Sequence, residues 1–156
     1  RRAEILMNIG DWGEAEAELR RLLERREEHV MALVHLGTCL NAMDKAEQAE
    51  RPLNKALQID PLNSDAWYQR GLLYLDFGRG DEALSDFESA AKHDTKHIDA
   101  RLMIAAIHHE GDNSELATAS WRKVLDIDPQ HRLARRRLEE CKDQSIARSH
   151  ILRPED

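Results

Sequence analysis

Histidines are the residues of this chain that first suggest chemistry, because neutral imidazoles bind metal ions and transfer protons. His108 and His109 are adjacent, so on a helix they would point about 100° apart and would not chelate one ion from one face. His93 and His97 are four residues apart, but the residues between them fall at the expected end of a helix. Neither Cys-x-x-Cys nor His-Glu-x-x-His occurs in the sequence. We therefore expect no metal ion and no cofactor.

The patterns of nucleophilic catalysis are also missing from the sequence. It contains no Gly-x-Ser-x-Gly and no glycine-rich phosphate loop, and Gly78-Arg79-Gly80 is interpreted as a turn between helices. The many carboxylates recur at positions expected to be solvated helix surface. We expect no enzyme activity in these residues.

The elements that carry these residues repeat every 34 positions. The block Ala66-Trp67-Tyr68-Gln69-Arg70-Gly71 follows the block Ala32-Leu33-Val34-His35-Leu36-Gly37 by this interval. The same step leads from Gly71 to Ala105 and from Phe87 to Trp121. Each unit has two runs of apolar residues at helical spacing, separated by a turn. A fixed period of this length predicts a stacked helical solenoid, a fold that serves as a binding surface.

Helix ends can be placed within each repeat. In residues 64–97, Ser64 or Asp65 is predicted to cap the first helix and Asp81 the second. Pro61 and Pro129 follow the ends of second helices, which proline cannot continue. We also expect a kink at the proline of residues 46–59, because it removes a backbone donor. Small residues are expected to face each other and let paired helices approach closely: Gly37, Gly71 and Ala105 opposite Ala49, Ala83 and Ala117.

The pattern closely resembles the tetratricopeptide repeat family. Its run of large apolar, small, aromatic and alanine positions is matched at Trp67, Gly71, Tyr74, Ala83, Phe87 and Ala90. The resemblance implies an all-α fold, a right-handed α-solenoid of helix–turn–helix repeats with a C-terminal capping helix. The array would occupy residues 1–147: a partial repeat 1–29, full repeats 30–63, 64–97 and 98–131, a capping helix 132–147, and a tail 148–156.

In this family the first helices line a concave groove, and the resemblance implies which residues face it. The predicted partner-binding residues are Val34, His35, Thr38, Asp65, Tyr68, Gln69, Leu72, Leu75, Asp76, Asp99, Leu102, Met103 and His109. The apolar members are predicted to form a contiguous exposed strip that the packing pattern does not demand, which marks an interaction site. The expected ligand is a peptide or helix of a partner protein, with Tyr68 as the central contact and basic flanks facing the aspartates.

Other partner classes are less compatible with the sequence. No run of about 18 apolar residues is present, so no membrane insertion is expected. The net charge is −7, and the basic cluster Arg132, Arg135, Arg136 and Arg137 is interpreted as a solvated last helix, so no nucleic acid partner is expected. Some family members bind the acidic tails of chaperones through Lys and Asn residues, but Glu4 or Asp65 would occupy such positions here and repel the ligand.

Two alternatives stay open, namely self-assembly into a homo-oligomer and a docking domain of a larger enzyme. Arg1 already falls within a helix pattern, so we expect the chain to be a fragment. Cys39 and Cys141 lie three repeats apart, too far for a disulfide if each repeat adds about 10 Å. Free thiols agree with a reducing compartment such as the cytoplasm, without identifying it.

One arginine occupies a packing position. Arg70 stands where Leu36 and Ile104 stand in the neighbouring repeats. An unpaired guanidinium there would be costly, so we expect Arg70 either to find an acidic partner, with Asp99 or Glu110 as candidates, or to lay its stem along the apolar surface with its head in water. The alternative is that Arg70 hydrogen-bonds a ligand carbonyl in the groove.

Overall fold

The structure, a computed structural model, describes residues 1–151, with side chains as far as Cys141. The described residues are all-α, as predicted, and the chain divides into two compact units, the first spanning Arg1–Thr95 and the second beginning at Lys96. The first unit consists of α1 (Arg2–Asn8), α2 (Trp12–Arg25), α3 (Val30–Ala42), α4 (Ala46–Ile59), α5 (Ser64–Asp76) and α6 (Gly80–His93). The second consists of α7 (Ile98–Glu110), α8 (Ser114–Ile127) and α9 (Arg132–Ile151). Helix α9 thus runs past residue 147, the predicted end of the capping helix.

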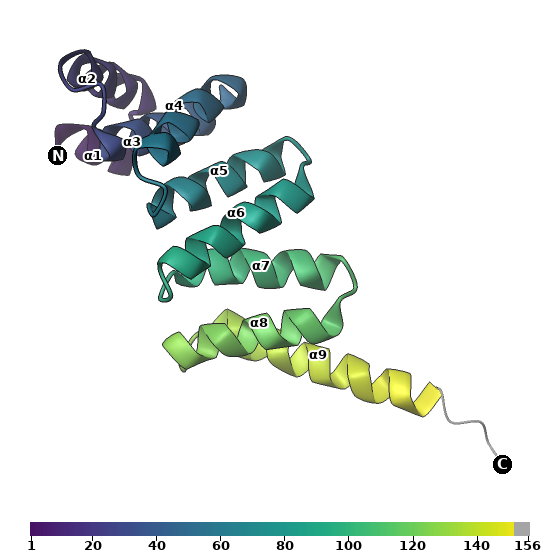
Figure 1. The fold of residues 1–156 in the computed structure, drawn as a ribbon. Helices are drawn as coiled ribbons and strands as arrows, with labels where there is room; N and C mark the ends of the chain where they lie inside the picture. The colour runs from purple at the N-terminus through teal and green to yellow at the C-terminus, as the bar shows by residue number, and fades with distance from the viewer. Residues whose placement is uncertain (152–156) are drawn as a thin grey trace. The chain divides into compact units, whose positions relative to one another are not determined.

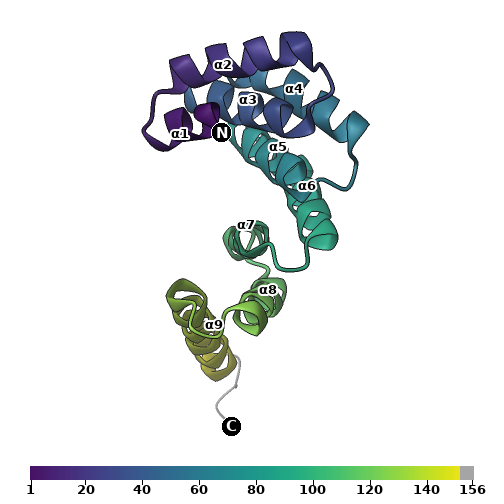
Figure 2. The same ribbon diagram turned by 90° about the vertical axis from the view of Figure 1, so that its left-hand side faces the viewer.

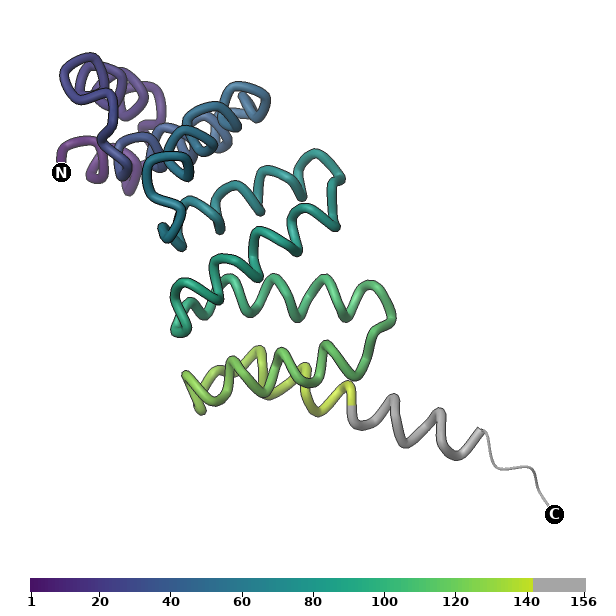
Figure 3. Tube along the Cα trace, viewed as in Figure 1, coloured from purple at the N-terminus to yellow at the C-terminus, as the bar shows by residue number. Residues whose placement is uncertain are grey.

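Within each unit, consecutive helices pack against each other as antiparallel hairpins (Figure 1 and Figure 2). Figure 3 traces the same hairpins along the Cα path. The core of the first unit includes Leu19, Leu33, Leu40, Leu53 and Leu73. That of the second includes Trp121 and Val124. Both cores are built from residues at helical spacing, as expected for amphipathic helices that bury one face.

The turn after each first helix repeats with the same backbone geometry. A residue with positive φ closes each of these helices: Gly10 (81°), Asp44 (58°), Gly78 (70°) and Asp112 (58°). In each case the backbone N–H of the residue that follows donates to the carbonyl five residues before it, with N···O distances of 2.8–2.9 Å. Glycine adopts this conformation without steric cost and aspartate tolerates it, which explains both residue types at one repeat position.

The caps of the first helices differ from the prediction. Asn63, one residue before the predicted Ser64, caps α5 by accepting a hydrogen bond from Ala66 N at 2.9 Å. Its equivalents are histidines whose Nδ1 accepts from the backbone of the first turn: His29, His97 and His131, with N···N distances of 3.2, 3.2 and 3.3 Å. The prediction of Asp81 as the cap of α6 is also wrong, because Arg79 holds that position and Asp81 lies in the first turn.

Loss of a histidine cap should destabilise the fold. We expect His29→Ala to lower the free energy of unfolding by about 1 kcal/mol, because the amide of Ala32 loses its acceptor. His29→Asn should restore most of the loss, since asparagine serves at the equivalent position in α5. Urea unfolding measures both variants, with the exposed His93→Ala as a control that should stay within about 0.5 kcal/mol. Equal destabilisation by the alanine and asparagine variants would contradict the capping role.

Two small residues of the first helices, Gly37 and Gly71, lie against large side chains of the paired helices, and the predicted placement opposite Ala49, Ala83 and Ala117 stays a prediction. A Cβ added at Gly71 would lie 2.7 Å from Phe87 Cε1, and one added at Gly37 would lie 2.5 Å from Leu53 Cγ. Each glycine therefore forms the depression into which a buried side chain of the paired helix fits. Pro52 lies within the continuous helix α4, and the predicted kink stays a prediction.

Candidate partner-binding surface

In the first unit the predicted partner-binding residues lie on α3 and α5, two helices that contact each other. Asp65 and Asp76 are exposed at the two ends of α5. Apart from Val34, the other predicted residues of the two helices are partly buried: His35 and Thr38 on α3, and Tyr68, Gln69, Leu72 and Leu75 on α5. The arrangement offers limited apolar area between two carboxylates, which suits a ligand with an apolar contact and basic groups beside it.

Val34 does not belong to this surface. Its side chain is 2% exposed and lies in the core cluster of the first unit, together with Leu6 of α1. The prediction that Val34 contributes to an exposed strip is therefore wrong. Periodicity could not reveal this burial, because it depends on residues of α1 and α2 that are distant in the sequence from Val34.

The residues equivalent to Val34 in the next two repeats also have packing roles. Tyr68 lies against Phe87 of α6, with ring centroids 5.7 Å apart and planes tilted by 50°. Leu102 is partly buried and packs against the core of the second unit. The expectation that packing makes no demand on these positions is therefore wrong. Leu72 and Leu75 remain the apolar members of the α5 surface that are partly exposed and belong to neither described core cluster.

Polar contacts link the first helices within the unit. Asn41 Nδ2 of α3 donates to Asp76 Oδ2 of α5 at 2.9 Å, which fixes the position of that carboxylate. Thr38 Oγ1 donates to the carbonyl of Val34 at 3.1 Å. The amide of Asn41 is neutral, so this contact holds the carboxylate of Asp76 in place without pairing it with a cation.

His35 lies among charged groups of α1, of α5 and of the residues that precede α1 and α3. Burial lowers its pKa, while the carboxylates of Glu4 on α1 and Asp65 on α5 act in the opposite direction. The charge of the N-terminus and of His29 also lowers the pKa. The neutral imidazole is therefore the form that the folded protein favours near neutral pH.

This preference predicts a pH dependence of stability. Because the folded-state pKa is depressed, the contribution of His35 is present above its unfolded pKa of about 6.5 and is lost as the pH falls through the folded value. We expect the free energy of unfolding to decrease more between about pH 7.5 and pH 5.5 in the wild type than in His35→Gln. Urea denaturation of both proteins at the two pH values measures the difference. An identical decrease in both would contradict the assignment.

The second unit carries the remaining predicted residues on α7. Asp99 is exposed in the first turn of this helix, and Met103 and His109 are partly buried. With Leu102 engaged in packing, this part of the predicted surface offers less free apolar area than the sequence suggested.

Arg70 has structural partners that the sequence did not indicate. Its Nε and Nη2 donate to Asp86 Oδ2 and Oδ1 at 2.7 and 2.9 Å, and Nη1 donates to Asn54 Oδ1 at 2.7 Å. The guanidinium also lies over the rings of Trp67 and Tyr74, 4.8 and 5.5 Å from their centroids. The candidate partners Asp99 and Glu110 are therefore wrong. Hydrogen bonding to Asp86 raises the pKa of Arg70, so the guanidinium stays charged.

Metal binding and membrane insertion each require a particular arrangement of residues in the described part of the chain. No group of three or more histidine, cysteine, aspartate or glutamate side chains lies close enough there to hold a metal ion. Among the described helices, none combines the length and apolar composition needed to cross a membrane. Cys39 and Cys141 are both buried free thiols, and burial raises the pKa of Cys39 to about 11.

Comparison with known families identifies the class of protein. The model of the middle TPR-like domain of cilia and flagella-associated protein 70 matches residues 3–93, and a tetratricopeptide repeat model matches residues 68–132. The chain belongs to the tetratricopeptide repeat family. The all-α repeat solenoid predicted from the sequence is thus confirmed.

Two solved structures have a similar fold. The crystal structure of MamA is similar with a TM-score of 0.81 and 17% identity, covering 96% of this chain and 87% of that one. The structure of YrrB, described as a TPR protein with an unusual peptide-binding site, has a TM-score of 0.70 and 26% identity, with coverage of 85% and 68%.

The curated relatives are much longer proteins. The probable glycosyltransferase SPINDLY of Solanum lycopersicum is 30% identical over 105 residues, which are 67% of this chain and 11% of that protein. The mitochondrial import receptor subunit TOM70 of Rattus norvegicus is 28% identical over 95 residues, 58% of this chain and 16% of the receptor. The chain thus spans about a tenth to a sixth of these relatives, so an activity of the whole relative does not transfer to it.

Proposed function

We propose that this chain binds a peptide or helix of a partner protein on the surface formed by α3 and α5, without catalysing a reaction itself. The observation that carries the proposal is the position of Leu72 and Leu75, partly exposed apolar residues between the carboxylates of Asp65 and Asp76. The peptide-binding site named for YrrB, a relative by fold and by 26% identity, supports the same kind of ligand. Binding through a few apolar contacts with charged neighbours is typical of such recognition.

A charge placed in the apolar part of this surface tests the proposal. We expect Leu72→Asp to weaken binding of peptides selected from a display library on the wild-type protein by more than about 1 kcal/mol, because a carboxylate would have to be desolvated at the contact. Fluorescence anisotropy measures the affinity and circular dichroism the helicity. Leu62→Asp is the matched control, since Leu62 is 68% exposed in the loop before α5. The proposal fails if both variants bind equally well.

Nucleic acid is not among the proposed partners. Within the basic cluster of α9, Arg136 and Arg137 pair with Glu140 at 3.3 and 2.9 Å. Such pairing leaves fewer free cations to neutralise phosphates.

Self-assembly is the second candidate function, favoured by a specific observation on α1. Ile5 and Ile9 are 59% and 72% exposed and stand four residues apart, so they form one apolar face. A second copy of the chain is the proposed occupant of that face. Light scattering at increasing concentration, with Ile5→Glu and Ile9→Glu together as the comparison, separates this assembly from peptide binding. A docking role within a larger enzyme remains a third proposal, since relatives such as SPINDLY are far longer than this chain.

A further inference from the structure

The second helices of the hairpins in the first unit are α2, α4 and α6. The space between α2 and α4 and the space between α4 and α6 are equivalent in the repeat, but different side chains line them. Between α4 and α6 the place is occupied by the guanidinium of Arg70, held by Asp86 and Asn54 and covered by the rings of Trp67 and Tyr74. Large aromatic side chains and a satisfied ion pair occupy this position. It therefore shows what a repeat of this chain uses to fill the space.

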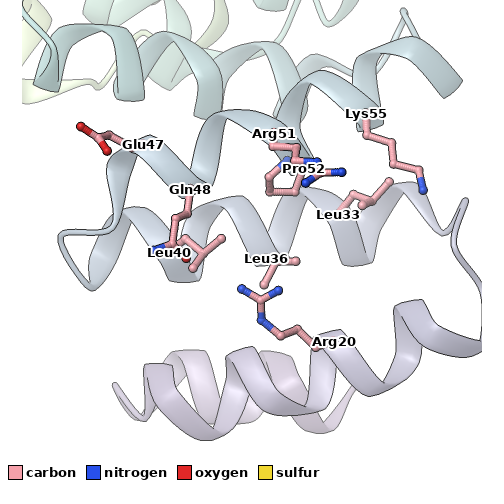
Figure 4. A pocket seen from close by; sticks show the side chains of 9 residues that line it. All are labelled: Arg20, Leu33, Leu36, Leu40, Glu47, Gln48, Arg51, Pro52 and Lys55. Atoms are coloured by element: carbon pink, nitrogen blue, oxygen red, sulfur yellow. The ribbon is translucent and has the colours of Figure 1, made fainter.

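The place between α2 and α4 is open. Counting back 34 residues, Leu33, Leu36 and Leu40 stand for Trp67, Arg70 and Tyr74, and Pro52 stands for Asp86. These smaller side chains leave a hollow of about 510 Å³, lined by the three leucines of α3 and by Pro52. Figure 4 shows Arg20 reaching from α2 toward Leu36, with the α4 residues on the opposite side.

The charged residues that line the hollow are mostly basic. Arg20, Arg51 and Lys55 contribute cations, and Glu47 contributes a carboxylate. Arg20 is paired with Glu16 at 2.8 Å. Neither Arg51 nor Lys55 has an ion pair within the part of the chain whose side chains are described. A basic rim around an apolar floor on a chain of net charge −7 favours an acidic ligand locally.

We propose that this hollow binds an acidic segment of a partner protein, which inserts one apolar side chain between α2 and α4. The leucines and Pro52 receive that side chain, and carboxylates on either side of it meet Arg51 and Lys55. Burial of the apolar group supplies affinity, and the rim charges reject basic segments. The site uses other residues than the α3–α5 surface. Its rim is basic, whereas that surface lies between Asp65 and Asp76, so the two sites would recognise ligands of opposite charge.

The probe for this proposal is a fluorescein-labelled synthetic peptide with one phenylalanine flanked by two glutamates on each side. The matched peptide has glutamines in place of the glutamates. Anisotropy measures binding, and methyl NMR of the leucines reports whether Leu36 is contacted. We expect the glutamate peptide to bind and shift the Leu36 methyl signals, and the glutamine peptide to bind at least about tenfold more weakly. Equal binding of the two peptides would overturn the proposal.

Charge reversal and filling of the hollow provide the variants. Arg51→Glu with Lys55→Glu should weaken the glutamate peptide at least about tenfold, whereas Lys92→Glu with Arg122→Glu, an equal charge change at exposed positions elsewhere, should not. Leu36→Arg with Pro52→Asp copies the Arg70–Asp86 pair into the hollow. This double variant should no longer bind the glutamate peptide there. If the control pair weakens binding as much as Arg51→Glu with Lys55→Glu, the proposal is wrong.

Other occupants give different results. Leu72→Asp should leave the affinity for the glutamate peptide unchanged. If that variant no longer binds the peptide, the peptide lies on the α3–α5 surface, which overturns this proposal alone. A shift of the Leu36 methyl signals with protein concentration, without peptide, would show that a second copy fills the hollow and would overturn it as well. Failure of Leu72→Asp to affect selected peptides contradicts only the function proposed for α3 and α5.

Discussion

Asp86→Ala is expected to lower the free energy of unfolding by about 3 kcal/mol, because it leaves the guanidinium of Arg70 without its carboxylate in a largely buried position. The two side chains are 17% and 5% exposed, for Arg70 and Asp86 respectively. Asn54 would remain as a neutral acceptor but cannot replace the lost charge. Urea or thermal unfolding of the variant, with helicity followed by circular dichroism, measures the loss.

A double-mutant cycle separates the ion pair from simple loss of packing. Arg70→Leu together with Asp86→Ala should be much less destabilising than Asp86→Ala alone, because no unpaired charge remains. The preceding repeat supports this expectation, since it has the uncharged residues Leu36 and Pro52 at the equivalent positions. If the double variant is as unstable as the sum of the two single variants, the pair has no special role.

Gly71→Ala is expected to destabilise the fold by about 2 kcal/mol, although alanine is the better helix former. The added Cβ would lie 2.7 and 2.9 Å from Cε1 and Cδ1 of Phe87. That ring is 0% exposed and also contacts Tyr68, so moving it would disturb the packing of the core. Overpacking of this kind costs about 1–3 kcal/mol, which exceeds the helix propensity of about 1 kcal/mol gained from alanine.

The control for this prediction is another helical glycine. Gly13 of α2 has no heavy atom within 4 Å of the position that a Cβ would take. Gly13→Ala should therefore leave stability unchanged or raise it by up to about 1 kcal/mol. Thermal unfolding of both variants decides the matter: stabilisation by Gly71→Ala would show that Phe87 relaxes and that the close approach is not required.

The sequence by itself determined the helical repeat fold and the position of the turn between paired helices. The 34-residue period predicts paired helices because each pair buries one apolar face against its neighbours, and local residue types set the turns. The turn predicted at Gly78-Arg79-Gly80 falls between α5 and α6, where Gly78 has positive φ and Arg79 immediately precedes the first residue of α6. The caps were missed at His29 and its equivalents, because histidine is not among the usual capping residues.

Only the tertiary structure decided which side chains are available to a partner. Val34 and Tyr68 occupy the same repeat position, yet one is in the core and the other lies partly exposed against Phe87. Arg70 found its partner in Asp86 on the paired helix, and the leucine at the equivalent position left a hollow. Burial, pairing and open space depend on side chains that come together from different helices, and the spacing of residues along one helix contains no information about them.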